Sequence, residues 1–111
     1  MGRVKLLHPA ADEIELSAVL HALSDPQRLV IVRALAESPS ARRCGSFHVP
    51  VTKSTLTHHF RVLREAGVID QQEDGTARLN SLRREDLDRR FPGLLDAVLG
   101  APAPTAAPPG G

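Results

Sequence analysis

Apolar residues recur with helical spacing near the start of the chain. Leu16, Val19, Leu20 and Leu23 fall at positions i, i+3, i+4 and i+7, which is typical of a helix that buries one face. We expect this helix to begin near Asp12. The acidic residues of its first turn, where the helix dipole favours negative charge, are Asp12, Glu13 and Glu15.

A second helix is predicted directly after the first. Asp25 suits the N-cap, and Pro26 suits the first helical position because its missing N–H is not needed there. We expect this helix to run to about Glu37, where a Ser-Pro-Ser sequence ends it. Its predicted inner face consists of Leu29, Val32, Leu35 and Ala36.

The strongest helical pattern runs from Lys53 to about Ala66. Thr52 is its predicted N-cap, and Gly67 is placed to end it in the left-handed conformation. The inner face of this helix is predicted to be Leu56, Phe60 or His59, Leu63 and Ala66. Before it, residues 41–47 are compatible with a short third helix.

The spacing of apolar residues changes after residue 67. Two strand-length segments, 68–72 and 76–82, flank an Asp-Gly pair at residues 74–75, which predicts a β-hairpin. A last helix begins near Arg83 and is interrupted at residues 91–93, with Pro92 expected at the first position of its second piece. The pattern therefore predicts a mainly α chain with a small β-hairpin, in the order α-α-α-α-β-β-α.

A single domain is expected from the length of 111 residues, which leaves room for one modest core. We expect a flexible N-terminus over 1–11, the folded domain over 12–99 and a disordered tail over 100–111, which is rich in proline, alanine and glycine. The longest apolar run, Leu29–Val32, is far too short to span a membrane, and no signal-peptide core follows Met1. We therefore expect a cytoplasmic protein with no membrane partner.

Composition excludes several classes of site. Three Phe with no Tyr and no Trp argue against modules that stack single-stranded bases on aromatic rings. The single cysteine, Cys44, rules out a disulfide within the chain and a four-cysteine zinc site. We find no paired carboxylates on a common face, no nucleophile–base spacing and no phosphate-binding glycine loop. We therefore expect neither an enzyme nor a cofactor.

The net charge of +1 conceals a basic middle. Residues 38–66 carry five basic residues against one acidic residue, Glu65, whereas the segments before and after are each net negative. This distribution favours an anionic partner for the middle of the chain, with a solvated basic face as the alternative.

The outer face of the helix at residues 53–66 is rich in hydrogen-bonding side chains. They cluster on its first two turns and are Lys53, Ser54, Thr55, Thr57, His58 and Arg61. The recognition helix of a helix-turn-helix presents such N-terminal residues to the major groove of double-stranded DNA. Thr, Ser and His are mediocre helix formers, so a merely solvated face would be expected to use other residues.

Two segments carry a resemblance to a known family. Residues 52–69 read TKSTLTHHFRVLREAGVI, and residues 20–32 read LHALSDPQRLVIV. They resemble, respectively, the recognition helix leading into the wing and the junction of the first two helices in the ArsR/SmtB family. The resemblance covers about residues 10–99. It implies a winged helix-turn-helix that acts as a homodimeric, operator-binding transcriptional regulator, usually a repressor released by an inducer.

The resemblance also implies which residues contact DNA. The family's contact positions fall on Lys53, Ser54, Thr55, Thr57 and His58, with Arg61 as an addition. The wing would comprise residues 71–78, with Arg78 as its contact to a phosphate or the minor groove. Because acidic residues lie in and beside this wing, at Asp70, Glu73 and Asp74, we expect it to contribute little affinity.

Cys44 is the candidate sensor of an inducer. Arg42 and Arg43 precede it and favour the thiolate, which oxidants or electrophiles modify. The hypothesis is that modification moves the short third helix and weakens operator binding. A small buried apolar residue is the alternative. A metal-responsive repressor using Cys44 and His48 is a further alternative, but soft metals need more than one thiolate, so we expect no metal site. The small-molecule or oxidant inducer is unknown.

Two further expectations concern partners and histidines. The apolar stripes of the first and last helices predict a homodimer. A winged-helix module that binds protein rather than DNA is the alternative function, against which the basic middle argues. We expect His58 to point outward, His59 to pack inside or between helices, and His21 to pack or cap at a helix end.

Overall fold

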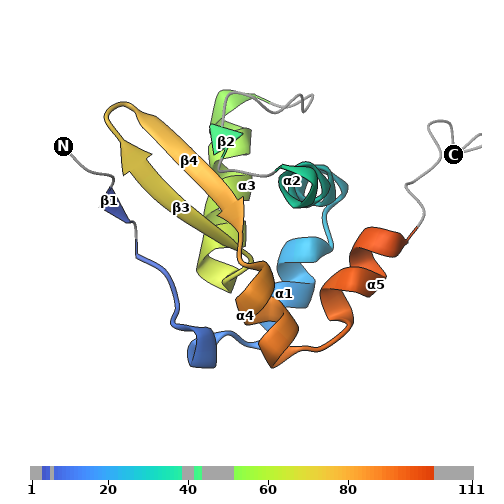
Figure 1. Ribbon diagram of the computed structural model, residues 1–111. Coiled ribbons are helices and arrows are strands. Elements are labelled where there is room, and N and C mark those ends of the chain that lie inside the picture. Colours follow the sequence, from blue (N-terminus) through green and yellow to red (C-terminus); the bar gives the residue numbers. More distant parts are fainter. Residues whose placement is uncertain (1–3, 6, 39–41, 44–51, 102–111) are drawn as a thin grey trace, which may run out of the picture.

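The computed structural model describes residues 4–5, 7–38, 42–43 and 52–101 (Figure 1). Along the chain the elements are β1 (Val4–Lys5), the 3-10 helix η1 (Ala11–Glu13), α1 (Leu16–Leu23), α2 (Pro26–Glu37), β2 (Arg42–Arg43), α3 (Lys53–Ala66), β3 (Ile69–Asp74), β4 (Ala77–Leu82), α4 (Arg84–Arg90) and α5 (Leu94–Gly100). The predicted fold class is confirmed, because the described chain is mostly helical and carries one antiparallel hairpin, β3–β4.

The helix ends follow the capping residues that the sequence predicts. Asp25 caps α2, since its Oδ1 accepts hydrogen bonds from the backbone N–H groups of Gln27 at 2.8 Å and Arg28 at 3.3 Å. Thr52 caps α3 by accepting from the N–H of Thr55 at 3.2 Å. Gly67 ends α3 with φ of +87°, a left-handed conformation that favours glycine. These three predictions are confirmed.

The first helix differs from its prediction. Asp12 and Glu13 belong to η1, and Ile14 follows in an extended conformation with its side chain buried in the core. Consequently α1 begins at Leu16. Its buried residues are Val19, Ala22 and Leu23, whereas Leu16 and Leu20, which were predicted to face inward, are 45% and 48% exposed.

The sheet is larger than the predicted hairpin. It has four antiparallel strands in the order β1-β3-β4-β2. Val4–Lys5 pair with Gln72–Glu73 on one side, in a segment expected to be flexible. Arg42–Arg43 pair with Leu79–Asn80 on the other side, so the short third helix expected over residues 41–47 is wrong for the part of that segment that the structure describes. Two-residue strands carry no periodicity, and hydrogen bonds to a distant hairpin define them.

The last two helices are separated by a turn. Gly93 is the N-cap of α5, with φ of +85°, and the helix begins at Leu94. Pro92 therefore precedes the cap and does not occupy the first helical position, so that expectation is wrong. Arg33 of α2 donates to the carbonyl of Ala101 at 3.1 Å, which joins the end of α5 to α2.

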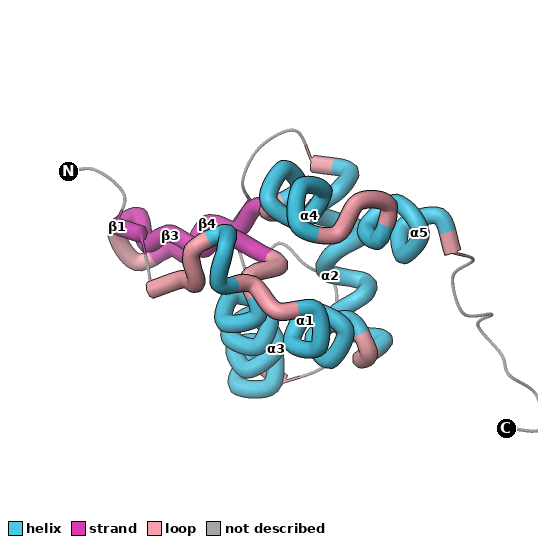
Figure 2. Tube along the Cα trace, turned by 90° about the horizontal axis from the view of Figure 1, so that it is seen from below, coloured by secondary structure: helices cyan, strands magenta, loops and turns pink. Residues whose placement is uncertain are grey.

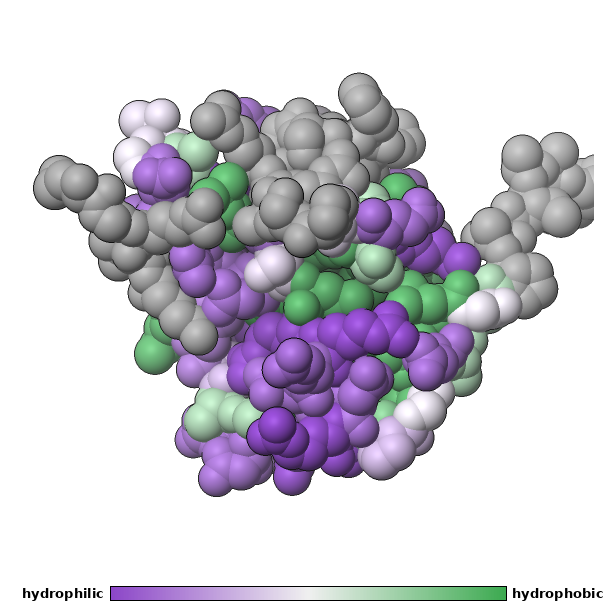
Figure 3. Space-filling view, in the orientation of Figure 1, coloured by the Kyte–Doolittle hydropathy of each residue, from purple (hydrophilic) through white to green (hydrophobic). Residues whose placement is uncertain are grey.

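The core lies where α1, α2 and α3 meet the beginning of the hairpin. Ile31 and Val32 of α2 pack with Phe60 and Leu63 of α3, and each of these side chains is no more than 1% exposed. Ile31 is buried, whereas Ala36, predicted for the inner face, is exposed. Figure 2 shows α1 and α3 side by side, with the hairpin extending away from the helices. In Figure 3 polar side chains gather over α4, and apolar ones lie beside them toward α2.

Candidate nucleic-acid interface

One face of α3 is buried and the opposite face is polar and exposed. His59, Phe60, Leu63 and Ala66 are buried against the core. All six residues predicted to contact DNA are exposed, namely Lys53, Ser54, Thr55, Thr57, His58 and Arg61, and so is the acidic Glu65 in the last turn. The structure therefore brings all six to the solvent side of one helix, most of them within its first two turns.

The hydroxyl groups at the start of α3 are linked to one another. Thr52 Oγ1 donates to Thr55 Oγ1 at 2.9 Å and lies 3.3 Å from Ser54 Oγ. Thr57 Oγ1 donates to the carbonyl of Lys53 at 3.0 Å. The proton of Thr57 is thus used within the helix and its lone pairs face outward, which suits the amino group of a base. Thr55, which accepts from Thr52, keeps its own proton for an acceptor such as a phosphate oxygen.

A buried arginine joins the helices behind this face. Arg28 of α2 is 6% exposed. Its Nε donates to the carbonyl of Ala22 at 2.7 Å and its Nη2 to the carbonyl of His21 at 3.2 Å, both at the end of α1. Its Nη1 lies 3.2 Å from Nδ1 of His59 on α3. One guanidinium therefore joins α2, which carries it, to both α1 and α3.

The contact with Arg28 fixes the protonation state of His59. A guanidinium has only donors, so Nδ1 of His59 accepts and its proton resides on Nε2. Burial lowers the pKa of His59 below 6.5, and the charges of Arg28 and His58 lower it further, while Asp25 opposes them. The prediction that His59 packs inside the fold is confirmed. His58 is exposed as predicted, whereas His21 exposes its side chain and takes part in capping only through its carbonyl.

The pKa of Asp25, the cap of α2, is also shifted by its surroundings. Partial burial raises the pKa of its carboxyl group, but the hydrogen bonds from the N–H groups of Gln27 and Arg28 outweigh this. The positive charges near it, His59 when protonated and Arg28, add to the lowering. The net pKa is below its usual value of 3.8.

The predicted wing is the β3–β4 hairpin, which turns at Gly75 with φ of +65°. Arg78 is exposed on β4, opposite Glu73 on β3, and its Nη2 lies 3.8 Å from Glu73 Oε1. Both side chains are 43% exposed, so this ion pair is weak. The wing thus offers Arg78 as a cation that its own acidic residue partly neutralises.

The remaining sequence predictions concern the wing contact, Cys44, His48, metal sites and membrane spans. Arg78 lies on a separate element from the six α3 residues. Cys44 and His48 lie outside the described residues. Within the ranges that the structure describes, no three His, Cys, Asp or Glu residues are grouped so that they could hold a metal ion. In those same ranges, no helix has the length and apolar character needed to cross a membrane.

Sequence reasoning missed three polar residues that organise this region. Arg28, Gln71 and Asn80 are buried, and the last two are fully inaccessible. A signal was available in the strands, because Gln71 and Asn80 share an alternation with the apolar residues Ile69 and Leu82.

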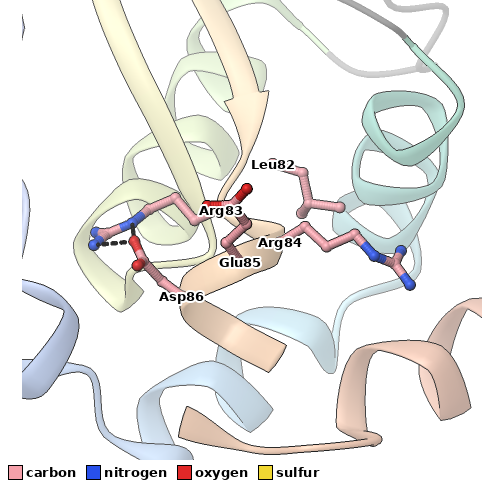
Figure 4. A pocket seen from close by; sticks show the side chains of 5 residues that line it. All are labelled: Leu82, Arg83, Arg84, Glu85 and Asp86. Carbon is pink, nitrogen blue, oxygen red and sulfur yellow. Dashed lines mark hydrogen bonds and ion pairs between the residues drawn. The ribbon is translucent and has the colours of Figure 1, made fainter. Parts of the chain in front are cut away.

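A pocket of about 350 Å³ opens where β4 passes into α4 (Figure 4). Its lining residues are Leu82, Arg83, Arg84, Glu85 and Asp86. Arg83 turns back to pair with Asp86 at 2.9 Å, and Arg84 pairs with Asp96 of α5. None of the residues predicted to contact DNA lines this pocket.

Residues 25–71, which span α2, α3 and the start of β3, match the family described as bacterial regulatory protein, arsR family. The uncharacterized HTH-type transcriptional regulator YceK of Bacillus subtilis (strain 168) is 34% identical over 82 residues, 72% of this chain and 82% of the relative. The arsenical resistance operon repressor of Staphylococcus xylosus is 31% identical over 81 residues, 67% of this chain and 71% of the relative. A second uncharacterized HTH-type transcriptional regulator, from Methanocaldococcus jannaschii, is 32% identical over 59 residues, 52% of this chain and 66% of the relative.

Proposed function

Since the chain belongs to the arsR family of bacterial regulatory proteins and is a transcriptional regulator, we propose that it is a homodimeric repressor that binds operator DNA through α3. The observation that carries the proposal is the exposed polar face of α3, built from Lys53, Ser54, Thr55, Thr57, His58 and Arg61. A helix with one buried apolar face and short polar side chains at its exposed N-terminal end fits the major groove. Arg78 of the wing is the proposed second contact.

Two exposed leucines support the homodimer. Leu16 and Leu20 lie one turn apart on α1 and are about half exposed. A second copy that covered them would remove this apolar surface from water. A two-fold dimer would place its recognition helices about 34 Å apart, on successive major grooves of a palindromic site.

Binding of DNA is tested with a fragment from upstream of the chain's own gene. Lys53→Ala and Arg61→Ala should each weaken binding about tenfold and make the dependence of the affinity on salt shallower. Arg89→Ala is the matched control, because Arg89 is an exposed helical arginine on α4, away from α3. Binding that is equally strong in all four proteins, or no binding of the wild type at low salt, would refute the proposal.

The dimer is tested by sedimentation at micromolar concentration. Leu16→Glu combined with Leu20→Glu should yield monomers that bind the operator much more weakly, because a dimer contacts two half-sites at once. Glu37→Lys is a control for a charge change on an exposed position of α2. A wild type that sediments as a monomer would contradict the dimer while leaving DNA binding open to its own test.

Release by an inducer is proposed to act through Cys44. This residue follows β2 directly in the chain, and β2 pairs with β4 of the wing. A modified thiol would therefore perturb a segment joined in sequence to the wing sheet. Peroxide or a quinone should release operator DNA from the wild type and not from Cys44→Ser; release from both proteins would refute the thiol sensor.

A further inference from the structure

The inner face of the wing carries three cross-strand pairs of different character. Nearest the helices, Ile69 lies opposite Leu82, and Gln71 lies opposite Asn80 in the next inward pair. Toward the tip, Glu73 lies opposite Arg78. Because side chains alternate along a strand, these three pairs share one face of the hairpin. The polar pair therefore lies between the core and the charged pair that includes the proposed DNA contact.

The polar pair is connected to the recognition helix. Arg64, in the last turn of α3, donates from Nη1 to Oε1 of Gln71 at 2.7 Å. Gln71 in turn donates from Nε2 to Oδ1 of Asn80 at 2.8 Å. Asn80 Nδ2 reaches the backbone carbonyl of Arg78 at 3.5 Å. The contacts thus run from α3 across both strands to the residue that carries the wing cation.

The backbone at the same position is also held. The N–H of Gln71 donates to Nε2 of His8 at 2.8 Å, and the side chain of His8 is 4% exposed. The side chain of Gln71 has no exposed surface, nor has that of Asn80. An apolar pair at these positions would cost less free energy to bury, since buried polar groups lose stability unless each keeps its hydrogen bonds. A polar pair instead fixes the relative orientation of the two strands and the helix, because hydrogen bonds have preferred angles and apolar contacts do not.

We propose that Gln71 and Asn80 are positioning residues that hold the wing at a fixed angle to α3, so that Arg78 reaches DNA while α3 occupies the major groove. This inference rests on the proposed function. Arg64 supplies the contact from α3 through its Nη1, whereas its buried Nε has no hydrogen-bond partner among the residues that the structure describes. The hydrogen bond from Nη1 to Gln71 helps to orient this guanidinium.

The test is a double-mutant cycle on operator affinity. Gln71→Met removes the side-chain hydrogen bonds to Arg64 and Asn80 at similar length, and Arg78→Ala removes the wing contact. Each should weaken binding about threefold to tenfold and reduce the salt slope by about one. If Gln71 acts through Arg78, Gln71→Met should have no further effect in the Arg78→Ala protein, because the contact that it positions is already gone.

Lys53→Ala supplies the matched comparison, because Lys53 contacts DNA from α3 independently of the wing. Its effect should add to that of Gln71→Met. A merely structural role for Gln71 would instead give the same additivity with Arg78→Ala as with Lys53→Ala, and that result would overturn the proposal.

A second variant covers the case in which Gln71→Met does not fold. Arg64→Lys keeps the positive charge but lacks the planar group that reaches Gln71, and its site is only partly buried. It should give the same lack of additivity with Arg78→Ala. If the wild type binds no DNA, the proposed function fails; if it binds and both cycles are additive, only the positioning role fails.

Discussion

Nη1 of Arg28 lies 3.2 Å from Nδ1 of His59, a contact that joins α2 to α3 inside the core. Arg28→Met should lower the free energy of unfolding by about 3 kcal/mol, because it removes the buried donor to His59 and to the carbonyl of Ala22, and one of the donors to the carbonyl of His21. Urea denaturation measures this. Arg33→Met is the matched control on the same helix, since Arg33 bonds carbonyls at and just beyond the end of α5, and it should cost below about 1 kcal/mol. Equal losses would show that burial of the Arg28 contacts adds nothing.

Burial of His59, together with the charge of Arg28 beside it, makes stability depend on pH. The pKa of His59 is lowered below 6.5 in the folded protein, so below that pH the unfolded chain takes up a proton that the folded chain refuses. Protonation of His59 therefore does not reduce stability above pH 6.5. As the pH falls from 6.5 toward the lowered pKa, the free energy of unfolding decreases by up to about 1.4 kcal/mol per pH unit.

His59→Asn isolates this effect, because an amide oxygen near the position of Nδ1 still accepts from Arg28 but does not titrate. Urea denaturation at several pH values should show a flatter profile for His59→Asn than for the wild type. Parallel profiles would mean that other groups cause the acid sensitivity. Among these, Asp25 acts only at lower pH, near and below 3.8.

Gly67 and Gly75 both have positive φ but differ in what surrounds them. A Cβ on Gly67 would lie 2.6 Å from Cγ1 of Ile14, whose side chain is buried, whereas a Cβ on Gly75 would meet nothing within 4 Å. Gly75→Ala should therefore cost only the left-handed conformation, about 1 kcal/mol. Gly67→Ala should cost a further ~1–3 kcal/mol, because Ile14 must move. Thermal denaturation of the two variants checks this, and similar melting temperatures would contradict it.

Glu73 partly neutralises Arg78 across the hairpin, at 3.8 Å. Glu73→Gln should raise operator affinity about two- to fivefold, because Arg78 is released from its partner and a negative charge leaves the wing. Fluorescence anisotropy at two salt concentrations measures the change, which should shrink at high salt. Asp74→Asn removes an equal charge at the tip without touching Arg78 and should raise affinity less. An equal gain from both would mean that net charge alone matters.

Features set by neighbouring residues were predictable from the sequence. The caps at Asp25 and Thr52 and the left-handed Gly67 each depend on one side chain, or its absence, and on the helix beside it. The polar face of α3 follows from helical spacing alone. The hairpin turn at Gly75 likewise depends on two adjacent residues.

Features that depend on contacts between distant residues were not predictable from the sequence. The pairing of β1 and β2 with the hairpin depends on residues far away in the chain, and neither segment has a pattern of its own. The stripe on α1 included Leu16 and Leu20, because spacing alone does not show on which side of a helix the core lies. The burial of Arg28 depends on the carbonyls of α1 and on His59, which come together only in the folded chain.

The short strands β1 and β2 also affect how the protein behaves in concentrated solution. An open strand edge invites another molecule to add its own strand, which leads to aggregation. Here Gln72–Glu73 on one edge of the hairpin and Leu79–Asn80 on the other are already occupied by the same chain. A version shortened before His8 would uncover the β3 edge, and such a protein would be prone to associate strand to strand.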